Sequence, residues 1–139
     1  MKHPLMHKYI VLGVAGSIAA YKSVELASLL TKAGALVDVL MTPSAVEFVS
    51  PLTFQSITHR EVITDLFAPR NFTDIGHVSI AERADLMIVA PATANTIGKL
   101  AHGLGDDPIA TVALGITVPL IVAPAMDVGM WAHKGVQAN

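Results

Sequence analysis

The order of the predicted elements is the feature that most restricts the fold of this chain. Short apolar runs alternate with segments of helical character four times, and the runs cover residues 9–15, 35–41, 85–90 and 119–123. Each run consists almost entirely of Val, Ile, Leu, Met and Ala, which is typical of a strand covered on both faces. Strands that alternate with helices in this way predict an α/β fold with a parallel sheet.

Helices are predicted between the strands from capping and turn residues. The longest covers residues 18–33, with Ser17 as its cap and Gly34 as its left-handed end. Shorter elements are expected as helices at 45–49, 51–58, 77–84, 96–102 and 106–115, a short strand at 61–64, a loop at 67–76 and a turn at 91–95. The pattern predicts a doubly wound, three-layer sheet of Rossmann or flavodoxin-like type. It forms a single domain, residues 9–139, after a flexible N-terminus, residues 1–8.

Composition restricts the class of function. Hydrophobic residues make up 53% of the chain and charged residues 14%, against about 45–50% and 25% in ordinary soluble domains. This composition excludes a disordered chain, and a net charge of −2 argues against nucleic-acid binding. The absence of cysteine excludes disulfides, thiolate metal sites and a cysteine nucleophile within these residues, and no metal site is predicted. Apolar surface of so small a domain is expected to be buried between subunits.

An apolar stretch of 19 residues, 108–126, has the length of a membrane span. Pro108, Pro119 and Pro124 interrupt it, and a helix with interior prolines loses hydrogen bonds that lipid cannot replace. The stretch is therefore interpreted as a short helix, a turn and a buried strand, and no membrane association is predicted. Because residues 1–8 contain no signal-peptide core, the expected location is the cytoplasm.

Small and hydroxyl-bearing residues follow each of the four predicted strands, in the segments GSIAAYK (16–22), TPSA (42–45), PATAN (91–95) and PAMD (124–127). The carboxyl ends of parallel strands meet at one edge, where such sheets bind ligands. Gly16 allows close approach of an anion to the following helix start. The spacing fits neither GxGxxG nor the Walker pattern, in which Tyr21 stands at the second glycine. The residues alone predict a phosphorylated ligand, with a plain tight turn as the alternative.

The same segments occur in this order in one family. Together with Gly76-His77-Val78, Ala84-Asp85, Thr96 and Met130-Trp131, they make the chain resemble, from about Lys8 onward, the homo-oligomeric flavin-containing cysteine decarboxylases. Within that family the chain is most similar to the phosphopantothenoylcysteine decarboxylase branch. The resemblance implies an FMN-dependent carboxy-lyase that converts 4'-phosphopantothenoylcysteine to 4'-phosphopantetheine in coenzyme A biosynthesis. It also implies a trimer or trimer-based dodecamer, with a fused or separate phosphopantothenoylcysteine synthetase domain.

The resemblance also implies roles for individual residues. His77 matches the active-site histidine, and Asp127 stands where the family has an Asn that binds the substrate carboxylate. The positions that match FMN contacts are Gly16, Ser17, Ile18, Thr42, Ser44, Thr93, Ala94, Asn95, Thr96 and Ala125. In this chemistry FMN oxidises the cysteine moiety to a thioaldehyde, which can accept the electrons released with CO₂. A histidine suits the accompanying proton transfers, since its ordinary pKa is near neutrality.

Two features depart from the family pattern. An ionised Asp127 cannot donate a hydrogen bond to a substrate carboxylate. Either Asp127 is protonated when substrate binds, or it contacts another group such as a substrate amide N–H. The family's cysteine-bearing substrate clamp has no counterpart in these residues, so the chain is expected to be part of a longer protein. We expect FMN binding and the oxidative half of the reaction, with impaired completion.

Four other functions are alternatives for a chain with this pattern. A decarboxylase of peptidyl cysteine shares the core motifs, and the clamp that distinguishes the two substrates is missing. A prenylated-flavin synthase is disfavoured by His77 and by the segment 124–126, and a non-catalytic or regulatory FMN-binding protein by His77. A flavodoxin-like electron carrier is disfavoured because such carriers are strongly acidic, whereas this chain has a net charge of −2.

Overall fold

A four-stranded, all-parallel sheet lies at the centre of the computed structural model, which describes residues 2–68 and 76–139. The strands are β1 (Tyr9–Val14), β2 (Leu36–Met41), β3 (Leu86–Ala92) and β4 (Leu120–Pro124), in the order β2-β1-β3-β4. The chain moves outward from β1 to β2 and then returns past β1 to β3, so the direction of winding reverses between β1 and β3. The predicted doubly wound α/β fold is confirmed.

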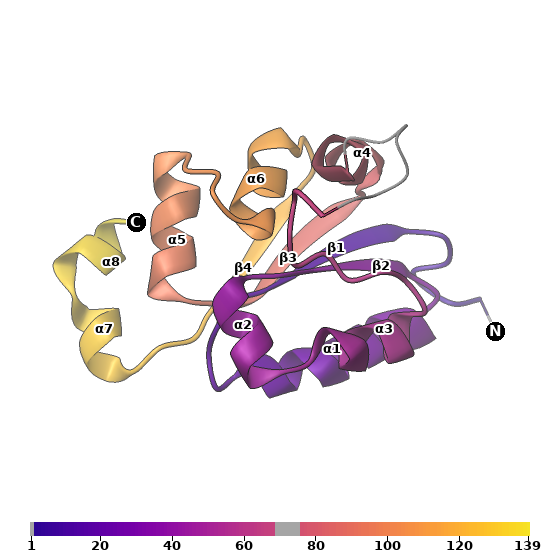
Figure 1. Cartoon of the computed structure of the whole chain (residues 1–139), viewed down its shortest axis with the longest axis horizontal. Coiled ribbons are helices and arrows are strands. Elements are labelled where there is room, and N and C mark those ends of the chain that lie inside the picture. Colours follow the sequence, from indigo (N-terminus) through magenta and orange to yellow (C-terminus); the bar gives the residue numbers. More distant parts are fainter. Residues whose placement is uncertain (1, 69–75) are drawn as a thin grey trace.

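Two layers of helices enclose this sheet (Figure 1). One layer contains α1 (Ala20–Lys32), α2 (Pro43–Phe48) and α3 (Pro51–Thr58). The other contains α4 (Gly76–Arg83), α5 (Ala94–His102) and α6 (Pro108–Gly115). After β4 the chain ends in α7 (Val128–Ala132) and α8 (Lys134–Ala138), which lie beside α5. These two helices were not expected from the sequence, because five residues are too few for a helical period.

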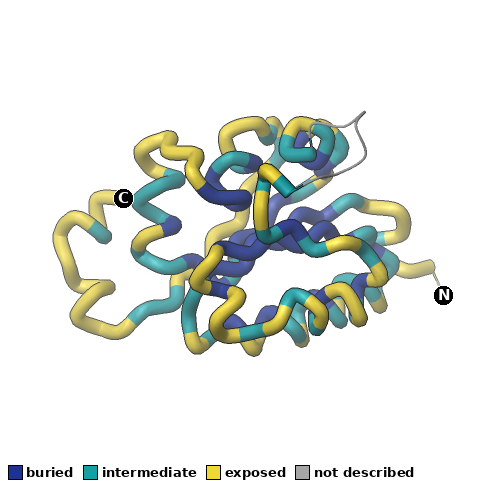
Figure 2. Tube along the Cα trace, in the orientation of Figure 1, coloured by how far each residue is buried: buried dark blue, intermediate teal, exposed yellow. Residues whose placement is uncertain are grey.

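The core consists of one apolar cluster on each face of the sheet. Because side chains alternate along a strand, Leu12 of β1 packs on the side of α1 and α3, and Val11 packs on the side of α4 and α6. Figure 2 shows β1, β2 and β3 as the most buried part of the chain. The prediction of strands covered on both faces is confirmed for these three.

The same prediction is wrong for β4. Leu120, Ile121 and Val122 expose 39%, 51% and 36% of their surface. The physical reason is the lack of covering helices: an open groove runs along each face of β4, whereas helices of both layers pack on β2, the other edge strand. The apolar residues of β4 therefore form a surface that remains exposed in the single chain.

Several element boundaries also differ from the predictions. Ser17 does not cap α1: the helix begins at Ala20, and the Ser17 hydroxyl instead accepts a hydrogen bond from the Ala19 N–H at 3.1 Å. The expected turn at 91–95 is shorter, since β3 extends to Ala92 and α5 begins at Ala94. The strand expected at 61–64 is reduced to a single parallel bridge between Leu40 and Ile63. By contrast, Gly34 has the predicted left-handed backbone, with φ of 97°.

The N-terminal residues 2–8 run beside the end of α1. The Leu5 N–H donates to the Ala33 carbonyl at 3.0 Å, and the His7 N–H to the Gly34 carbonyl at 3.2 Å. The flexibility predicted for this segment stays a prediction. The loop expected at 67–76 falls largely outside the described residues. Within the described ranges, no helix combines the length and the apolarity needed to cross a bilayer.

Candidate functional site

A cavity of about 360 Å³ lies where β1, β2 and β3 end, and we call it the strand-end cavity. It is lined by Gly16, Thr42, Pro43, Ser44, Thr93, Asn95, Thr96, Lys99, Asp107 and Met130. Its position is the carboxyl edge of the sheet beside the switch point between β1 and β3, where doubly wound folds bind their ligands. The fold therefore brings together six of the ten residues predicted to contact a cofactor: Gly16, Thr42, Ser44, Thr93, Asn95 and Thr96.

The turn after β1 touches the beginning of α2 through Gly16. A Cβ atom at this position would lie 2.8 Å from the carbonyl carbon of Ser44 and 3.1 Å from the backbone nitrogen of Ala45. Both atoms belong to the backbone, so they cannot move aside as a flexible side chain can. Only glycine allows these two segments to form one wall of the strand-end cavity.

Helix starts supply donors to the strand-end cavity. Thr42 caps α2, and its Oγ1 accepts a hydrogen bond from the Ala45 N–H at 3.1 Å. Thr93 caps α5 in the same way, with the Thr96 N–H donating to its Oγ1 at 3.2 Å. First-turn N–H groups without a helical partner and the positive end of the helix dipole favour an anion here. The exposed hydroxyl of Ser44, which bonds to no other described residue, is available to a ligand.

Lys99 and Asp107 also line the strand-end cavity, and the sequence reasoning missed both as site residues. The Lys99 ammonium donates to Asp107 Oδ2 at 2.8 Å and to Asp106 Oδ1 at 2.9 Å. The hydrogen bond to Asp107 is the main reason that the pKa of Lys99 is raised, and Lys99 in turn lowers the pKa of Asp106. Two carboxylates thus surround one ammonium, so an anion in the cavity must depend chiefly on backbone N–H groups and hydroxyls.

The acidic start predicted for the helix at 106–115 has a defined role in this arrangement. Asp107 caps α6, with the Ala110 N–H donating to its Oδ1 at 2.9 Å, while its other oxygen holds Lys99. The cap was visible in the sequence as an acidic pair before a helix. The link to Lys99 was not, because the two residues come from different helices that only the fold places side by side.

The remaining predicted cofactor residues lie outside this lining. Ser17 and Ile18 belong to the turn before α1, where Ile18 is highly exposed, and Ala94 begins α5. Ala125 lies on a second cavity of about 400 Å³ between α1 and β4. Its N–H donates to the Ala92 carbonyl at 3.0 Å, which ties the end of β4 to the end of β3.

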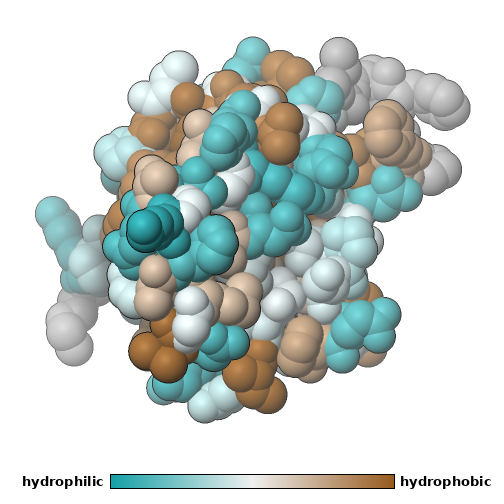
Figure 3. Space-filling view, turned by 90° about the vertical axis from the view of Figure 1, so that its left-hand side faces the viewer, coloured by the Kyte–Doolittle hydropathy of each residue, from teal (hydrophilic) through white to brown (hydrophobic). Residues whose placement is uncertain are grey.

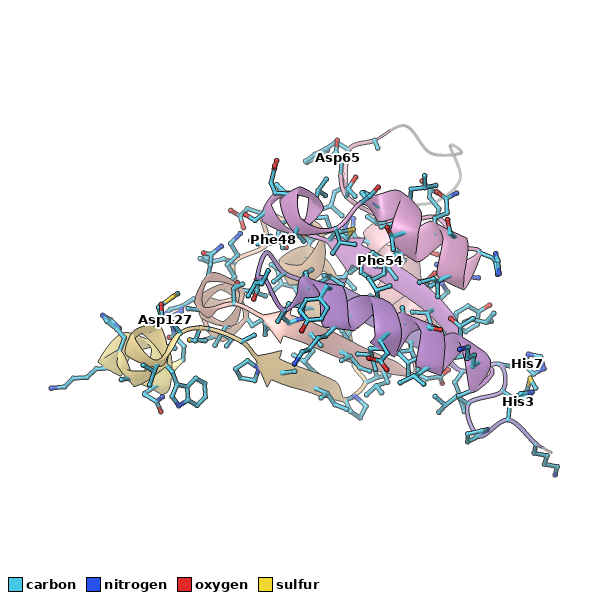
Figure 4. The ribbon with its side chains drawn as sticks, turned by 90° about the horizontal axis from the view of Figure 1, so that it is seen from below. His3, His7, Phe48, Phe54, Asp65 and Asp127 are labelled. Carbon is cyan, nitrogen blue, oxygen red and sulfur yellow. The ribbon has the colours of Figure 1, made fainter. Side chains whose placement is uncertain are left out.

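His77 and Asp127 lie on other elements. His77 is half-buried as the second residue of α4, one and two turns before the buried residues Ala81 and Ala84. Asp127 caps α7, with the Met130 N–H donating to its Oδ1 at 2.9 Å. It lines a third cavity of about 540 Å³, and Met130 borders both this cavity and the strand-end cavity. Figure 4 shows Asp127 at the opposite end of the molecule from His3 and His7.

In the parts of the chain that the structure describes, no three His, Asp or Glu side chains come together as potential metal ligands.

The ion pair between Lys99 and Asp107 gives a direct prediction about stability. Asp107→Asn keeps a cap oxygen for α6 but loses the charge that holds Lys99, and it is expected to lower the free energy of unfolding by about 1.5–3 kcal/mol, the usual contribution of a hydrogen bond to a charged group. Urea unfolding at pH 7 measures the change. Asp106→Asn is the matched control, and it should have almost no effect because the Asp106 side chain is 72% exposed. Equal effects of the two variants would contradict a structural role specific to Asp107.

Comparison with known proteins gives concordant family matches. The model of the family described as Flavoprotein matches residues 1–139. The coenzyme A biosynthesis bifunctional protein CoaBC of Bacillus subtilis is 51% identical over 135 residues, which are 97% of this chain and 33% of that protein. The chain thus spans about a third of the length of this bifunctional relative.

A shorter relative and a solved structure extend the match. The probable phosphopantothenoylcysteine decarboxylase of Streptococcus mutans is 43% identical over 136 residues, covering 96% of this chain and 76% of that protein. The crystal structure of the FMN-dependent cysteine decarboxylase SpaF superposes with a TM-score of 0.89 at 29% identity, over 96% of this chain and 77% of that one. Because the family model matches this chain from residue 1 to residue 139, the chain belongs to the flavoprotein family.

Proposed function

We propose that the chain binds FMN in the strand-end cavity and carries out the oxidative decarboxylation of the cysteine moiety of 4'-phosphopantothenoylcysteine, the first half of its conversion to 4'-phosphopantetheine in coenzyme A biosynthesis. The single observation that supports this most strongly is the convergence of six sequence-selected residues on one cavity at the switch point of a doubly wound sheet. Flavodoxin-like folds hold FMN at this place. The relatives named for coenzyme A biosynthesis and for phosphopantothenoylcysteine decarboxylation support the substrate.

The residues present fit a flavin phosphate. The close backbone approach at Gly16, the hydroxyl of Ser44 and the helix starts capped by Thr42 and Thr93 together form a cradle for an anion without a free cation in its lining. Ser17, Ile18, Ala94, Asn95, Thr96 and Ala125 complete the proposed set of FMN contacts. We regard residues 9–139 as the flavin-binding domain.

FMN, when bound, supplies the two-electron oxidation that makes loss of CO₂ from a cysteine feasible. The protein then has to bind and orient the substrate and handle protons. We assign the proton transfer to the His77 imidazole and contact with the substrate to Asp127. Both residues lie outside the strand-end cavity of their own chain.

The test begins with FMN titration, followed by incubation with 4'-phosphopantothenoylcysteine without oxygen. Mass spectrometry of the products and measurement of released CO₂ report the reaction. We expect uptake of one FMN per chain and release of CO₂. A protein that takes up no FMN would contradict the proposal. A parallel incubation with a peptide ending in cysteine tests the alternative substrate, and CO₂ release from the peptide alone would identify a peptidyl-cysteine decarboxylase.

Replacement of Asp127 tests the role of its charge. Asp127→Asn preserves the cap of α7, because Asn and Asp cap helices equally well. The amide can donate a hydrogen bond to a substrate carboxylate, which an ionised Asp cannot, so the substrate concentration for half-maximal CO₂ release is expected to fall about fivefold to tenfold. The measurement is the dependence of CO₂ release on substrate concentration between pH 6 and 9. Unchanged rates and an unchanged pH profile would show that the charge at this position is irrelevant.

We further propose that the protein is a cytoplasmic homo-oligomer, and that three copies form its basic unit. The exposed side chains of Leu120, Ile121 and Val122 support an assembly, as do Met130 and Trp131, which are nearly half exposed. Seen from the side of α7 and α8, hydrophobic side chains reach the surface among hydrophilic ones (Figure 3). Sedimentation velocity at micromolar concentration is expected to show a trimer or a multiple of it. A monomer at that concentration would overturn this part of the proposal.

A further inference from the structure

A buried carboxylate holds two arginines near the start of the sheet. Asp38 of β2 is only 4% exposed. Its Oδ1 accepts from Nε of Arg60 at 2.8 Å, and its Oδ2 accepts from Nε and a terminal nitrogen of Arg83 at 3.1 and 3.0 Å. Both guanidinium groups also lie over the ring of Tyr9, at 5.6 and 5.7 Å from its centre. The two arginines therefore share one carboxylate and one aromatic ring.

The two arginines differ in the element that carries them. Arg60 comes two residues after α3, in the segment that leads to the bridge residue Ile63. Arg83 is the last residue of α4, the helix whose second residue is His77. A second terminal nitrogen of Arg83 donates to the Ser79 hydroxyl one turn earlier at 3.1 Å, so the guanidinium is held from within α4 as well.

Two contacts on different faces of α4 set its rotation about its own axis. One is an apolar stripe of Ile80 and Ala81, continued by Ala84 directly after the helix, all three buried; by helical spacing His77 lies on the same side, toward the start of the helix. The other is the ion pair of Arg83 with Asp38. The two alanines allow α4 to pack closely against α6, since a Cβ atom at Gly115 would lie only 3.2 Å from that of Ala81, and the ion pair adds a second, directional restraint. A rotation of about 15° would move a side chain at the helix surface by about 1.5 Å, given a helix diameter of about 10–12 Å.

We propose that Arg83, through its bond to Asp38, is a positioning residue for His77. The inference depends on the proposed function, in which His77 transfers a proton during decarboxylation. Displacement of a catalytic group by about 1 Å is enough to slow a reaction by up to about 100-fold. Loss of the ion pair therefore acts on the rate of the bound complex rather than on FMN or substrate affinity.

The shared carboxylate makes a matched experiment possible. Arg83→Met and Arg60→Met each leave Asp38 with one arginine and remove one contact with Tyr9, so their costs in stability should be similar. We expect Arg83→Met to lower the maximal rate of CO₂ release about tenfold or more, with the half-saturating substrate concentration and FMN affinity within twofold. Arg60→Met should leave the maximal rate within twofold. Arg83→Lys, which restores the charge without the planar fork, should recover part of the rate.

A second readout does not depend on activity. Hydrogen exchange of the α4 amides, followed by mass spectrometry on the full chain, should accelerate in Arg83→Met and stay unchanged in Arg60→Met. Equal rate losses in the two variants, or an unchanged rate in Arg83→Met, would overturn the proposal. If His77→Asn leaves CO₂ release unaffected, the assigned role of His77 in the proposed function fails. The exchange data then still show separately whether Arg83 holds α4.

Discussion

His77→Asn is expected to lower the rate of CO₂ release from 4'-phosphopantothenoylcysteine by about 10²–10⁴, the usual contribution of a positioned acid–base group. Asparagine matches part of the shape of the imidazole but cannot take up and return a proton near neutral pH. His77 is absent from the lining of the strand-end cavity, so FMN affinity should stay within twofold. The measurement is CO₂ release under saturating FMN and substrate, together with an FMN titration of the same preparation.

His102→Asn is the matched control for this prediction. His102 lies at the exposed end of α5, where its Nδ1 is 2.8 Å from the Gly98 carbonyl, and it is the last residue of that helix. The same chemical change there should leave the rate within twofold. A His77→Asn protein that binds FMN and still releases CO₂ at the original rate would remove His77 from the mechanism. A protein that fails to bind FMN would show that His77 acts on the structure of the site instead.

The fold was predictable because its determinants are local. The continuous apolar composition of runs such as residues 9–15 and 35–41 indicates strands that are buried on both faces. Gly34 indicates the end of α1, because glycine readily adopts the left-handed backbone found there. Apart from errors at element boundaries, the wrong prediction with the largest consequence concerns contacts between distant residues. The exposure of β4 depends on which helices pack on its faces, and a continuous apolar run looks the same whether the covering surface belongs to this chain or to another.

The candidate site was predictable to the extent that it is built from segments that follow strands. Thr42 and Thr93 each follow a strand directly and Gly16 comes two residues after β1, and parallel topology alone brings such segments to one edge. Lys99 and Asp107 could not be found in this way. Their ion pair joins α5 to the start of α6. No periodicity or motif in the sequence indicates how two helices of the same layer lie relative to each other. The same applies to Asp38, whose two arginines lie 22 and 45 residues away.

Gly16→Ala is expected to weaken FMN binding by about 100-fold or more. The added Cβ would lie 2.8 Å from the Ser44 carbonyl carbon, a distance that forces either the turn after β1 or the start of α2 to move. Either movement displaces N–H groups and the Ser44 hydroxyl from an anion, and each hydrogen bond to a charged group is worth about 1.5–3 kcal/mol. The overpacking itself should lower the free energy of unfolding by about 1–3 kcal/mol. Fluorescence titration with FMN and urea unfolding without FMN measure the two effects separately.

Gly98→Ala is the matched control, because it adds the same methyl group at a glycine outside the strand-end cavity. Gly98 lies within α5, where a Cβ would meet only the Asn139 side chain at 3.4 Å. Alanine is favoured over glycine inside a helix, so this variant should gain about 0.5–1 kcal/mol in stability and keep its FMN affinity. A Gly16→Ala protein that binds FMN as tightly as Gly98→Ala would show that the ligand does not depend on the backbone contact between β1 and α2. In that case the strand-end cavity would lose its main support as the flavin site.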